Sequence, residues 1–310
     1  MVVIFIKSYF HDEELKKFLP IFVSSFAITY LVHMVGFLDI ILILILLGTL
    51  LYQGKYKYFG YCAGIIISLL VHEMYLIAFF PVLLFNIVFD QIRLGTLSRK
   101  NLIPLFGLML LAVLFSLRLA ALKPLTGELH LQLYSLYSAK ADFNVREDAI
   151  EVLNRSFTDN IAEMTKHFFA FKWYLKHLGA MFGFLWVSVL FLTLSINRIQ
   201  THFQSRWLCW MAAIASLSPL LLNFLGYDLF RWYALSVFNS FIVYALTTKL
   251  PLKKPSLISD RITQTSIFAL VAINLSTSVG LFDDVKINSF PYIDELKTIL
   301  RNNDTYNHIR

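Results

Sequence analysis

Long uninterrupted apolar runs constrain this chain more than any other feature of its sequence. Of its 310 residues, 58% are hydrophobic and only 15% are charged, whereas about a quarter of the residues of a typical soluble domain are charged. The apolar residues form blocks of roughly 17–25 residues, which is the length that crosses a bilayer core as a helix. We therefore expect an integral membrane protein rather than a soluble domain.

The apolar runs predict an all-α fold, a polytopic transmembrane helix bundle with about nine spans in a single domain of residues 1–310. The predicted spans are residues 18–35, 37–52, 58–72, 74–89, 102–120, 177–196, 207–225, 232–248 and 267–281. One helix over residues 58–89 would be about 48 Å long at 1.5 Å per residue, far more than one crossing needs. We expect a tight helical hairpin there, with its tip near His72 and Glu73. A re-entrant segment is the competing geometry, and it would keep the tip on the same side of the membrane.

The basic residues of the short connections predict the orientation of the bundle. They form five clusters: Lys16 and Lys17; Lys55 and Lys57; Arg93, Arg99 and Lys100; Arg198 and Arg206; and Lys249, Lys253, Lys254 and Arg261. With nine spans all five fall on one side, which the positive-inside rule assigns to the cytoplasm. We therefore expect a cytoplasmic N-terminus and an extracytoplasmic C-terminus. The same distribution accounts for the net charge of +7 without a nucleic-acid partner.

Two polar segments lie outside the predicted spans, an extracytoplasmic loop of residues 121–176 and a C-terminal tail of residues 283–310. In the loop, apolar residues between Ala149 and Phe168 recur at three- and four-residue steps, with Asp159 as a cap. This pattern predicts an amphipathic helix that lies on the outer leaflet or covers a cavity. An ordinary packed loop is the alternative.

Ionisable residues gather at the outer ends of the predicted spans, where each is a candidate for function because charge in a membrane is costly. They are His33, Asp39, His72, Glu73, Arg118, Asp228 and Arg231. Glu73 stands in an apolar setting, so its pKa should be raised unless it is paired, and a general base near neutral pH needs such a shift. The alternative for Glu73 is an ion pair or hydrogen bond that fixes the hairpin tip.

The segment GYDLFRW at 226–232 combines acidic, basic and aromatic residues. Asp228 and Arg231 share a helical face and either pair with each other or leave Arg231 to bind a lipid diphosphate through its planar fork. Tyr227 and Trp232 either belong to an interfacial aromatic belt or stack on sugar rings.

The remaining outer charges have structural and functional interpretations of their own. Asp39 either complements a helix dipole or contacts substrate, and Arg118 either reaches the headgroups or is a second phosphate ligand.

Metal-binding patterns are missing from the sequence. Cys62 and Cys209 lie in separate apolar runs, which indicates free buried thiols. Leu76 stands four residues beyond His72, where a zinc-binding His-Glu helix would carry its second histidine. We expect no cofactor, and a divalent metal remains open.

The span layout together with LVHEMYLIAFFP at 70–81 and GYDLFRW at 226–232 resembles bacterial envelope-polysaccharide proteins, the O-antigen polymerases and GT-C-like glycosyltransferases. The resemblance covers most of the chain. Asp39 matches the acidic residue that GT-C enzymes carry in the first outer loop, but it lacks the neighbouring acidic residue. The resemblance implies a glycosyltransferase of the bacterial inner membrane that moves a sugar or glycan from a polyprenyl-diphosphate carrier on the outer leaflet.

The resemblance also implies roles for the outer residues. His72, Glu73 and Asp228 would be catalytic, and the substrate-binding residues would be Arg231, Arg118, Asp39, Trp232 and Tyr227. Membrane lipids and other polysaccharide-assembly membrane proteins would be partners.

Two other classes of protein compete with an enzyme. A transporter or flippase without chemistry would place binding groups near the midplane, between helices broken by glycine or proline, and the predicted spans contain few prolines. A structural assembly subunit would tolerate substitution of the outer charges.

Overall fold

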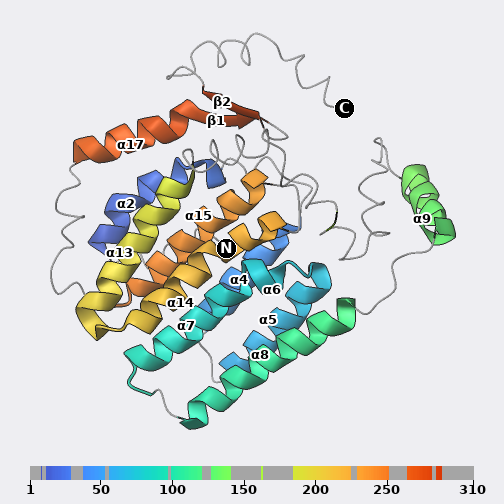
Figure 1. Cartoon of the computed structure of the whole chain (residues 1–310), viewed down its shortest axis with the longest axis horizontal. Coiled ribbons are helices and arrows are strands. Elements are labelled where there is room, and N and C mark those ends of the chain that lie inside the picture. The colour runs from blue at the N-terminus through green and yellow to red at the C-terminus, as the bar shows by residue number, and fades with distance from the viewer. Residues whose placement is uncertain are drawn as a thin grey trace.

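The computed structural model describes residues 8, 12–28, 38–52, 56–96, 99–120, 127–140, 162, 184–224, 229–250, 264–280 and 284–287. These residues are helical except for one short hairpin and the connecting turns (Figure 1). The first helices are α2 (Glu13–Val23), α4 (Asp39–Leu51), α5 (Lys57–Val71), α6 (Tyr75–Ala78), α7 (Phe80–Arg93), α8 (Arg99–Ala120) and α9 (Gly127–Lys140). They are followed by α13 (Trp186–Phe203), α14 (Arg206–Leu217), the 3-10 helix η3 (Ser218–Phe224), α15 (Leu229–Thr247) and α17 (Gln264–Ser276).

Each predicted span overlaps a described helix, although the helices that overlap the first and last spans have other bounds. Helix α2 begins at Glu13, before residue 18, because Asp12 caps its N-terminus by accepting a hydrogen bond from Leu15 N. Helix α17 ends at Ser276, and residues 277–280 form strand β1 (Thr277–Gly280) rather than a continued helix. Strand β1 pairs antiparallel with β2 (Asp284–Ile287), and the β-branched residues of both strands favour this extended backbone. The all-α expectation is therefore correct apart from this hairpin.

The segment 58–89 contains most of α5, all of α6 and the first part of α7, and the chain turns back after α5 as the hairpin prediction required. Helix α5 ends at Val71 because His72 adopts an extended backbone with φ −165° and ψ 131°. The turn through Met74 then leads into α6 and α7. In Figure 1, α5 and α7 both extend from α6 toward the same side of the bundle, so the chain reverses direction at this turn.

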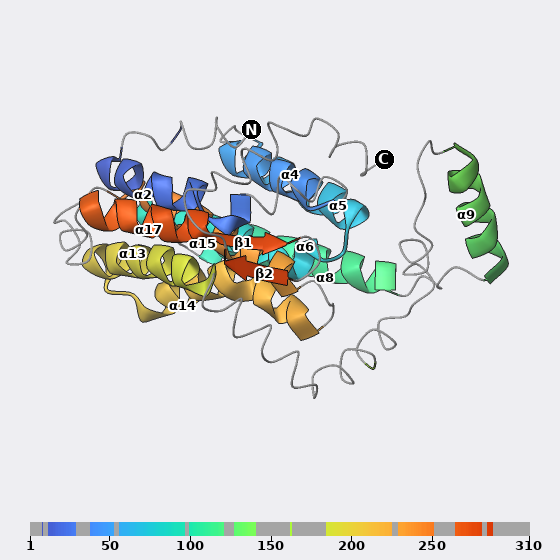
Figure 2. The same ribbon diagram turned by 90° about the horizontal axis from the view of Figure 1, so that it is seen from above.

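Helix α15 is the central helix of the bundle. It packs against α13, α14, α7, η3 and α2, and its side chains from Phe230 to Leu246 are buried. Seen from above, α4 and α5 lie on one side of α15, while α13 and α14 lie on the other (Figure 2). The ends of α15 therefore determine which residues from distant parts of the sequence meet.

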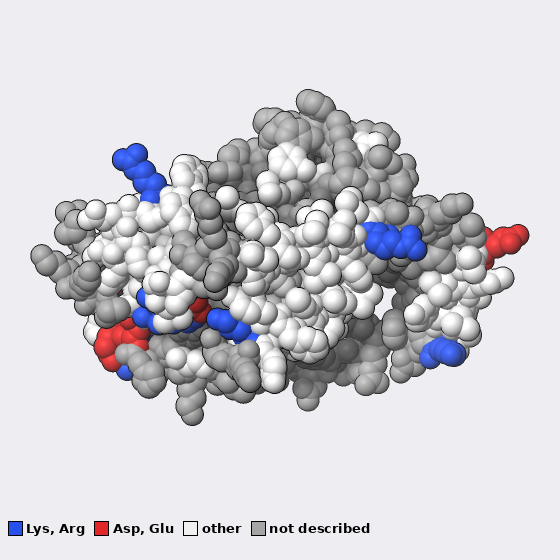
Figure 3. Space-filling model, turned by 90° about the horizontal axis from the view of Figure 1, so that it is seen from below, with Lys and Arg blue, Asp and Glu red and all other residues white. Residues whose placement is uncertain are grey.

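Two helical stretches of the described chain are long and apolar enough to cross a membrane, Tyr75–Arg93 and Arg206–Phe224. Shorter apolar helices cover Asp39–Leu51, Lys57–Val71, Ile103–Arg118 and Gln264–Leu275. Figure 3 shows a broad face without described charges, between groups of charged side chains at its two sides. These features indicate association with a membrane.

Helix α9 stands apart from the bundle in both ribbon views (Figures 1 and 2). It lies within the predicted 121–176 loop, which therefore does contain helix. The amphipathic helix expected between Ala149 and Phe168 lies outside the described residues, except for Ala162.

Candidate functional site

The buried ion pair between Asp39 and Arg231 joins two segments that are far apart in the sequence. Arg231 Nε donates to Asp39 Oδ2 at 2.6 Å, and Nη2 donates to Oδ1 at 2.8 Å. The side chains are only 7% and 2% exposed, respectively. Asp39 is the first residue of α4, where its negative charge also complements the helix dipole. A pair with Asp228 was one of the two interpretations of Arg231 from the sequence. Asp228 lies outside the described residues, as does Tyr227.

The same guanidinium touches the hairpin tip and an aromatic ring. Arg231 Nη2 lies 3.2 Å from Met74 Sδ, and the guanidinium carbon lies 4.8 Å from the centroid of the Trp232 ring. Trp232 is 6% exposed, so its ring packs under Arg231 and is not open to a sugar. The sequence interpretation did not expect this contact, because it treated Trp232 as an interfacial or sugar-stacking residue.

His72 and Glu73 form the hairpin tip itself. His72 Nδ1 lies 3.3 Å from Glu73 Oε2, and the Glu73 side chain is 75% exposed. The hydrogen bond with His72 is the main reason why the pKa of Glu73 is lowered from 4.5 to about 2, against the opposing effect of partial burial. The sequence interpretation expected a raised pKa only for an unpaired Glu73, and the structure shows the alternative, a hydrogen bond with His72 at the hairpin tip. A carboxylate with so low a pKa stays ionised and is a poor proton acceptor near neutral pH.

Two groups compete for the Nδ1 atom of His72. The backbone N–H of Met74 donates to Nδ1 at 3.2 Å, which requires a lone pair on that nitrogen. Glu73 instead favours a proton on Nδ1, which would leave the lone pair on Nε2 to accept a proton from a substrate. The contact with Glu73 and the hydrogen bond from Met74 therefore favour opposite tautomers of His72.

The outer residues proposed from the sequence therefore meet in part. Asp39, Arg231, Trp232 and the hairpin tip lie together, because Arg231 contacts both Asp39 and Met74. Arg118 is exposed near the end of α8, a helix that packs against α5 and α6. His33, also expected on this side, lies outside the described residues.

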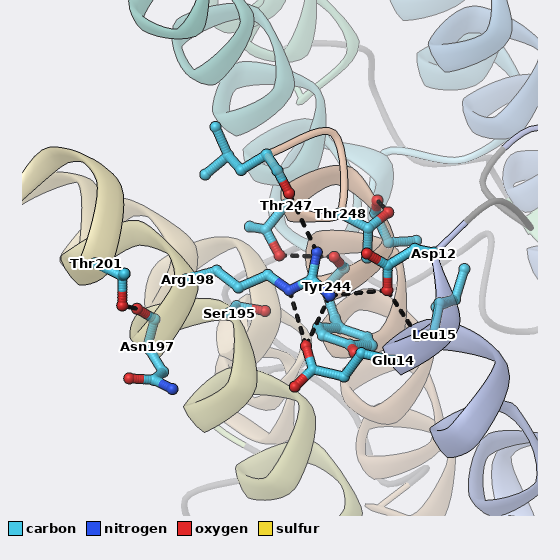
Figure 4. A network of polar contacts seen from close by, with 12 residues as sticks. Asp12, Glu14, Leu15, Ser195, Asn197, Arg198, Thr201, Tyr244, Thr247 and Thr248 are labelled. Atoms are coloured by element: carbon cyan, nitrogen blue, oxygen red, sulfur yellow. Dashed lines mark hydrogen bonds and ion pairs between the residues drawn. The ribbon is translucent and has the colours of Figure 1, made fainter. Parts of the chain in front are cut away.

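A second buried charge cluster, which the sequence did not predict, lies at the opposite end of the bundle (Figure 4). Arg198 Nη2 donates to Glu14 Oε2 at 2.7 Å and to Asp12 Oδ1 at 2.8 Å. Nε also donates to Glu14 Oε2, at 2.9 Å, and the guanidinium lies over the Tyr244 ring. This network ties α2 to α13 and α15. The acids next to the first apolar run were its only sequence signal.

Lys249 forms a neighbouring buried cluster just after α15. Its Nζ lies 3.1 Å from Asp90 Oδ2 and 3.3 Å from Asn86 Oδ1, and Arg93 Nε also bonds Asp90. Burial lowers the pKa of Lys249, although the charge of Asp90 opposes this. Lys16, Arg93, Arg198 and Lys249, one residue from each of four basic clusters, thus lie at one end of the bundle together with acidic partners.

Asn239, in the middle of α15, contacts two helix breaks. Its Nδ2 donates to Ala78 O at 2.6 Å and to Ala215 O at 3.2 Å. Pro219 has no N–H to bond Ala215 O, and the N–H of Val82 bonds Phe79 O rather than Ala78 O. One buried amide therefore satisfies two backbone carbonyls that the breaks leave without a helical donor.

No three His, Cys, Asp or Glu side chains within the described ranges gather where they could hold a metal ion. Both cysteines are free thiols. No protein-family model, characterised protein or solved structure matches this chain.

Proposed function

We propose that this chain is a multi-pass protein of the bacterial inner membrane with about nine crossings. The stretch Tyr75–Arg93 has 19 residues, which gives about 28 Å of helix, close to the ~30 Å bilayer core. Large apolar side chains on several helices face outward: Phe59, Ile103, Phe106, Trp210 and Phe268 are each at least 65% exposed. The bundle end that holds Lys16, Arg198 and Lys249 is assigned to the cytoplasm, and the end that holds Asp39 and Arg231 to the outside.

Within that membrane we propose a glycosyltransferase of the glycan-polymerase type, which acts on a polyprenyl-diphosphate-linked glycan at the outer face. One observation supports it most directly. The contact between Arg231 and Met74 brings together the two segments, 70–81 and 226–232, on which the resemblance to O-antigen polymerases and GT-C-like enzymes rests. Both lie at the end of the bundle away from the basic clusters.

In this proposal His72 is the proton acceptor and Glu73 holds its ring in the basic tautomer. The acceptor hydroxyl oxygen attacks the anomeric carbon, the bond from that carbon to the diphosphate oxygen breaks, and the hydroxyl proton passes to His72 Nε2. The departing diphosphate carries the negative charge, which the exposed Arg118 would stabilise. Asp228 and Tyr227 keep their proposed places beside the sugar.

Arg231 and Asp39 take a different role from the one their sequence suggested. Because Nε and Nη2 of Arg231 are bonded to Asp39, this edge of the guanidinium is not available to a phosphate. The pair instead positions the hairpin tip through Met74. Asp39 is thus a positioning residue rather than a group that touches substrate.

The variant Glu73→Gln tests this proposal in cells that depend on the protein for surface glycan. We expect glycan chains to shorten or disappear on a gel while the amount of protein in the membrane stays normal. The matched control is Glu13→Gln, since Glu13 is also an exposed, paired glutamate (80% exposed, 2.6 Å from Lys16) but lies at the other end. An unchanged glycan profile in Glu73→Gln would contradict the proposed chemistry.

Transport is the second candidate function, and the helix breaks at Asn239 favour it. Many transporters bind their cargo between discontinuous helices inside the bundle, and α6–α7 and α14–η3 are two such helices. Purified protein in vesicles with a lipid-linked glycan separates the two functions. A transferase lengthens the glycan, whereas a transporter moves it across the bilayer at unchanged length.

A further inference from the structure

Unpaired polar atoms occur on three elements that pack against one another, α14, η3 and α15. Four buried side-chain oxygens in this region have no hydrogen-bond partner: Ser216 Oγ, Ser218 Oγ, Asn223 Oδ1 and Asn239 Oδ1. Ser216 and Asn239 are fully buried, and Ser218 is 4% exposed. Buried polar atoms nearly always have a partner, and an unpaired one in a native structure calls for a water or an ion. The bilayer core supplies no solvent to replace that partner.

The backbone at this break also lacks a donor. Helix α14 passes directly into η3 at Ser218, whose N–H bonds Ile214 O. Pro219 removes the donor for Ala215 O, which the amide of Asn239 replaces. The neighbouring serines Ser236 and Ser240 of α15 bond to carbonyls of their own helix, whereas Ser216 and Ser218 do not.

We propose that the α14–η3 break and Asn239 form a binding site for a monovalent cation, with Na⁺ as the ion to test. The unpaired atoms are all neutral oxygens. Divalent ions such as Ca²⁺ and Mg²⁺ rely on carboxylates, and Asp12, Glu14, Asp39 and Asp90 are paired with cations at the two ends of the bundle. Backbone carbonyls of unwound helix segments also hold coupling ions in transporters. The site does not depend on the proposed glycan chemistry.

The experiment measures thermal unfolding of the full-length chain in detergent, in NaCl, KCl and choline chloride at equal ionic strength. A cation that binds only the folded state raises the unfolding midpoint. We expect a midpoint several degrees higher in NaCl than in choline chloride. Equal midpoints in the three salts would overturn the proposal and leave ordered water as the partner of these atoms.

Two variants make the result specific to this site. The double variant Ser216→Ala, Ser218→Ala removes two proposed ligands without breaking a hydrogen bond, so it should fold and lose most of the Na⁺ effect. Ser188→Ala is the matched control, because Ser188 Oγ on α13 is also buried and unpaired. It should keep the full effect. A Na⁺ effect that survives unchanged in the double variant would also refute the site.

Discussion

Neutralising Asp39 in the variant Asp39→Asn should strongly destabilise the fold, because it leaves the Arg231 charge buried without its partner. The Arg231 side chain is only 7% exposed and its bonds to Asp39 are 2.6 and 2.8 Å long. Removing one partner of such a pair costs about 3–5 kcal/mol. This loss agrees with an attraction of about 4 kcal/mol between unit charges ~4 Å apart at an effective dielectric constant of ~20. The folded-to-unfolded ratio should therefore fall more than about a hundredfold.

A double-mutant cycle measured by equilibrium unfolding in detergent tests this reasoning. The combined variant Asp39→Leu, Arg231→Met removes both charges and should recover most of the lost stability. The control Glu13→Gln breaks an ion pair with the same 2.6 Å distance but an 80% exposed carboxylate, so it should cost about 0–1 kcal/mol. The explanation fails if Asp39→Asn costs no more than Glu13→Gln. It also fails if the double variant loses as much stability as the single variants Asp39→Leu and Arg231→Met lose in sum.

Three further predictions concern packing, backbone satisfaction and pH. Gly64→Ala should destabilise the α4–α5 contact, because a Cβ there would lie 2.5 Å from Thr49 Oγ1. The control Gly107→Ala places its Cβ where nothing lies within 4 Å, so it should stabilise α8 by up to about 1 kcal/mol. Unfolding midpoints that shift in the same direction in both variants would contradict this. Asn239→Leu should lower the free energy of unfolding by about 2–4 kcal/mol, because two buried carbonyls lose their donor. A loss below about 1 kcal/mol would show that the carbonyls find other partners. Because the pKa of Glu73 is lowered from 4.5 to about 2, its contribution is present above about pH 4.5 and lost as the pH falls toward 2. Because Glu73 is exposed, its contribution to the free energy of unfolding stays below about 1 kcal/mol. The difference in unfolding free energy between wild type and Glu73→Gln should therefore be small and should disappear in acid. A difference that grows in acid would refute the pairing.

Much of the secondary structure could be predicted from the sequence, because apolar runs long enough to cross a bilayer form helices wherever no proline or polar break interrupts them. The break at His72 was predictable on length alone, since a single helix through residues 58–89 would be far too long. The strand β1 was not, because residues 277–280 (TSVG) directly follow an apolar run and their extended backbone pairs with β2.

The candidate site was predicted only in part, because its contacts join residues that are far apart in the chain. The sequence singled out Asp39, Glu73 and Arg231 because charges at the ends of apolar runs are costly. It offered Asp228 as a partner of Arg231 by local spacing, but it gave no sign of the buried pair with Asp39, 192 residues away in the chain. The low pKa of Glu73 likewise depends on how the turn exposes the carboxylate and places it against His72.

The sequence by itself determined where the chain is apolar, where its basic residues cluster and where its helices lie, because these are properties of neighbouring residues. Tertiary structure alone decided which charges neutralise each other at the two ends of the bundle. Arg198 meets Asp12 and Glu14, and Asn239 meets two broken helices, only because α15 lies at the centre of the packed bundle. Ion pairs and hydrogen bonds act over a few ångströms, so they depend on packing that no local pattern encodes.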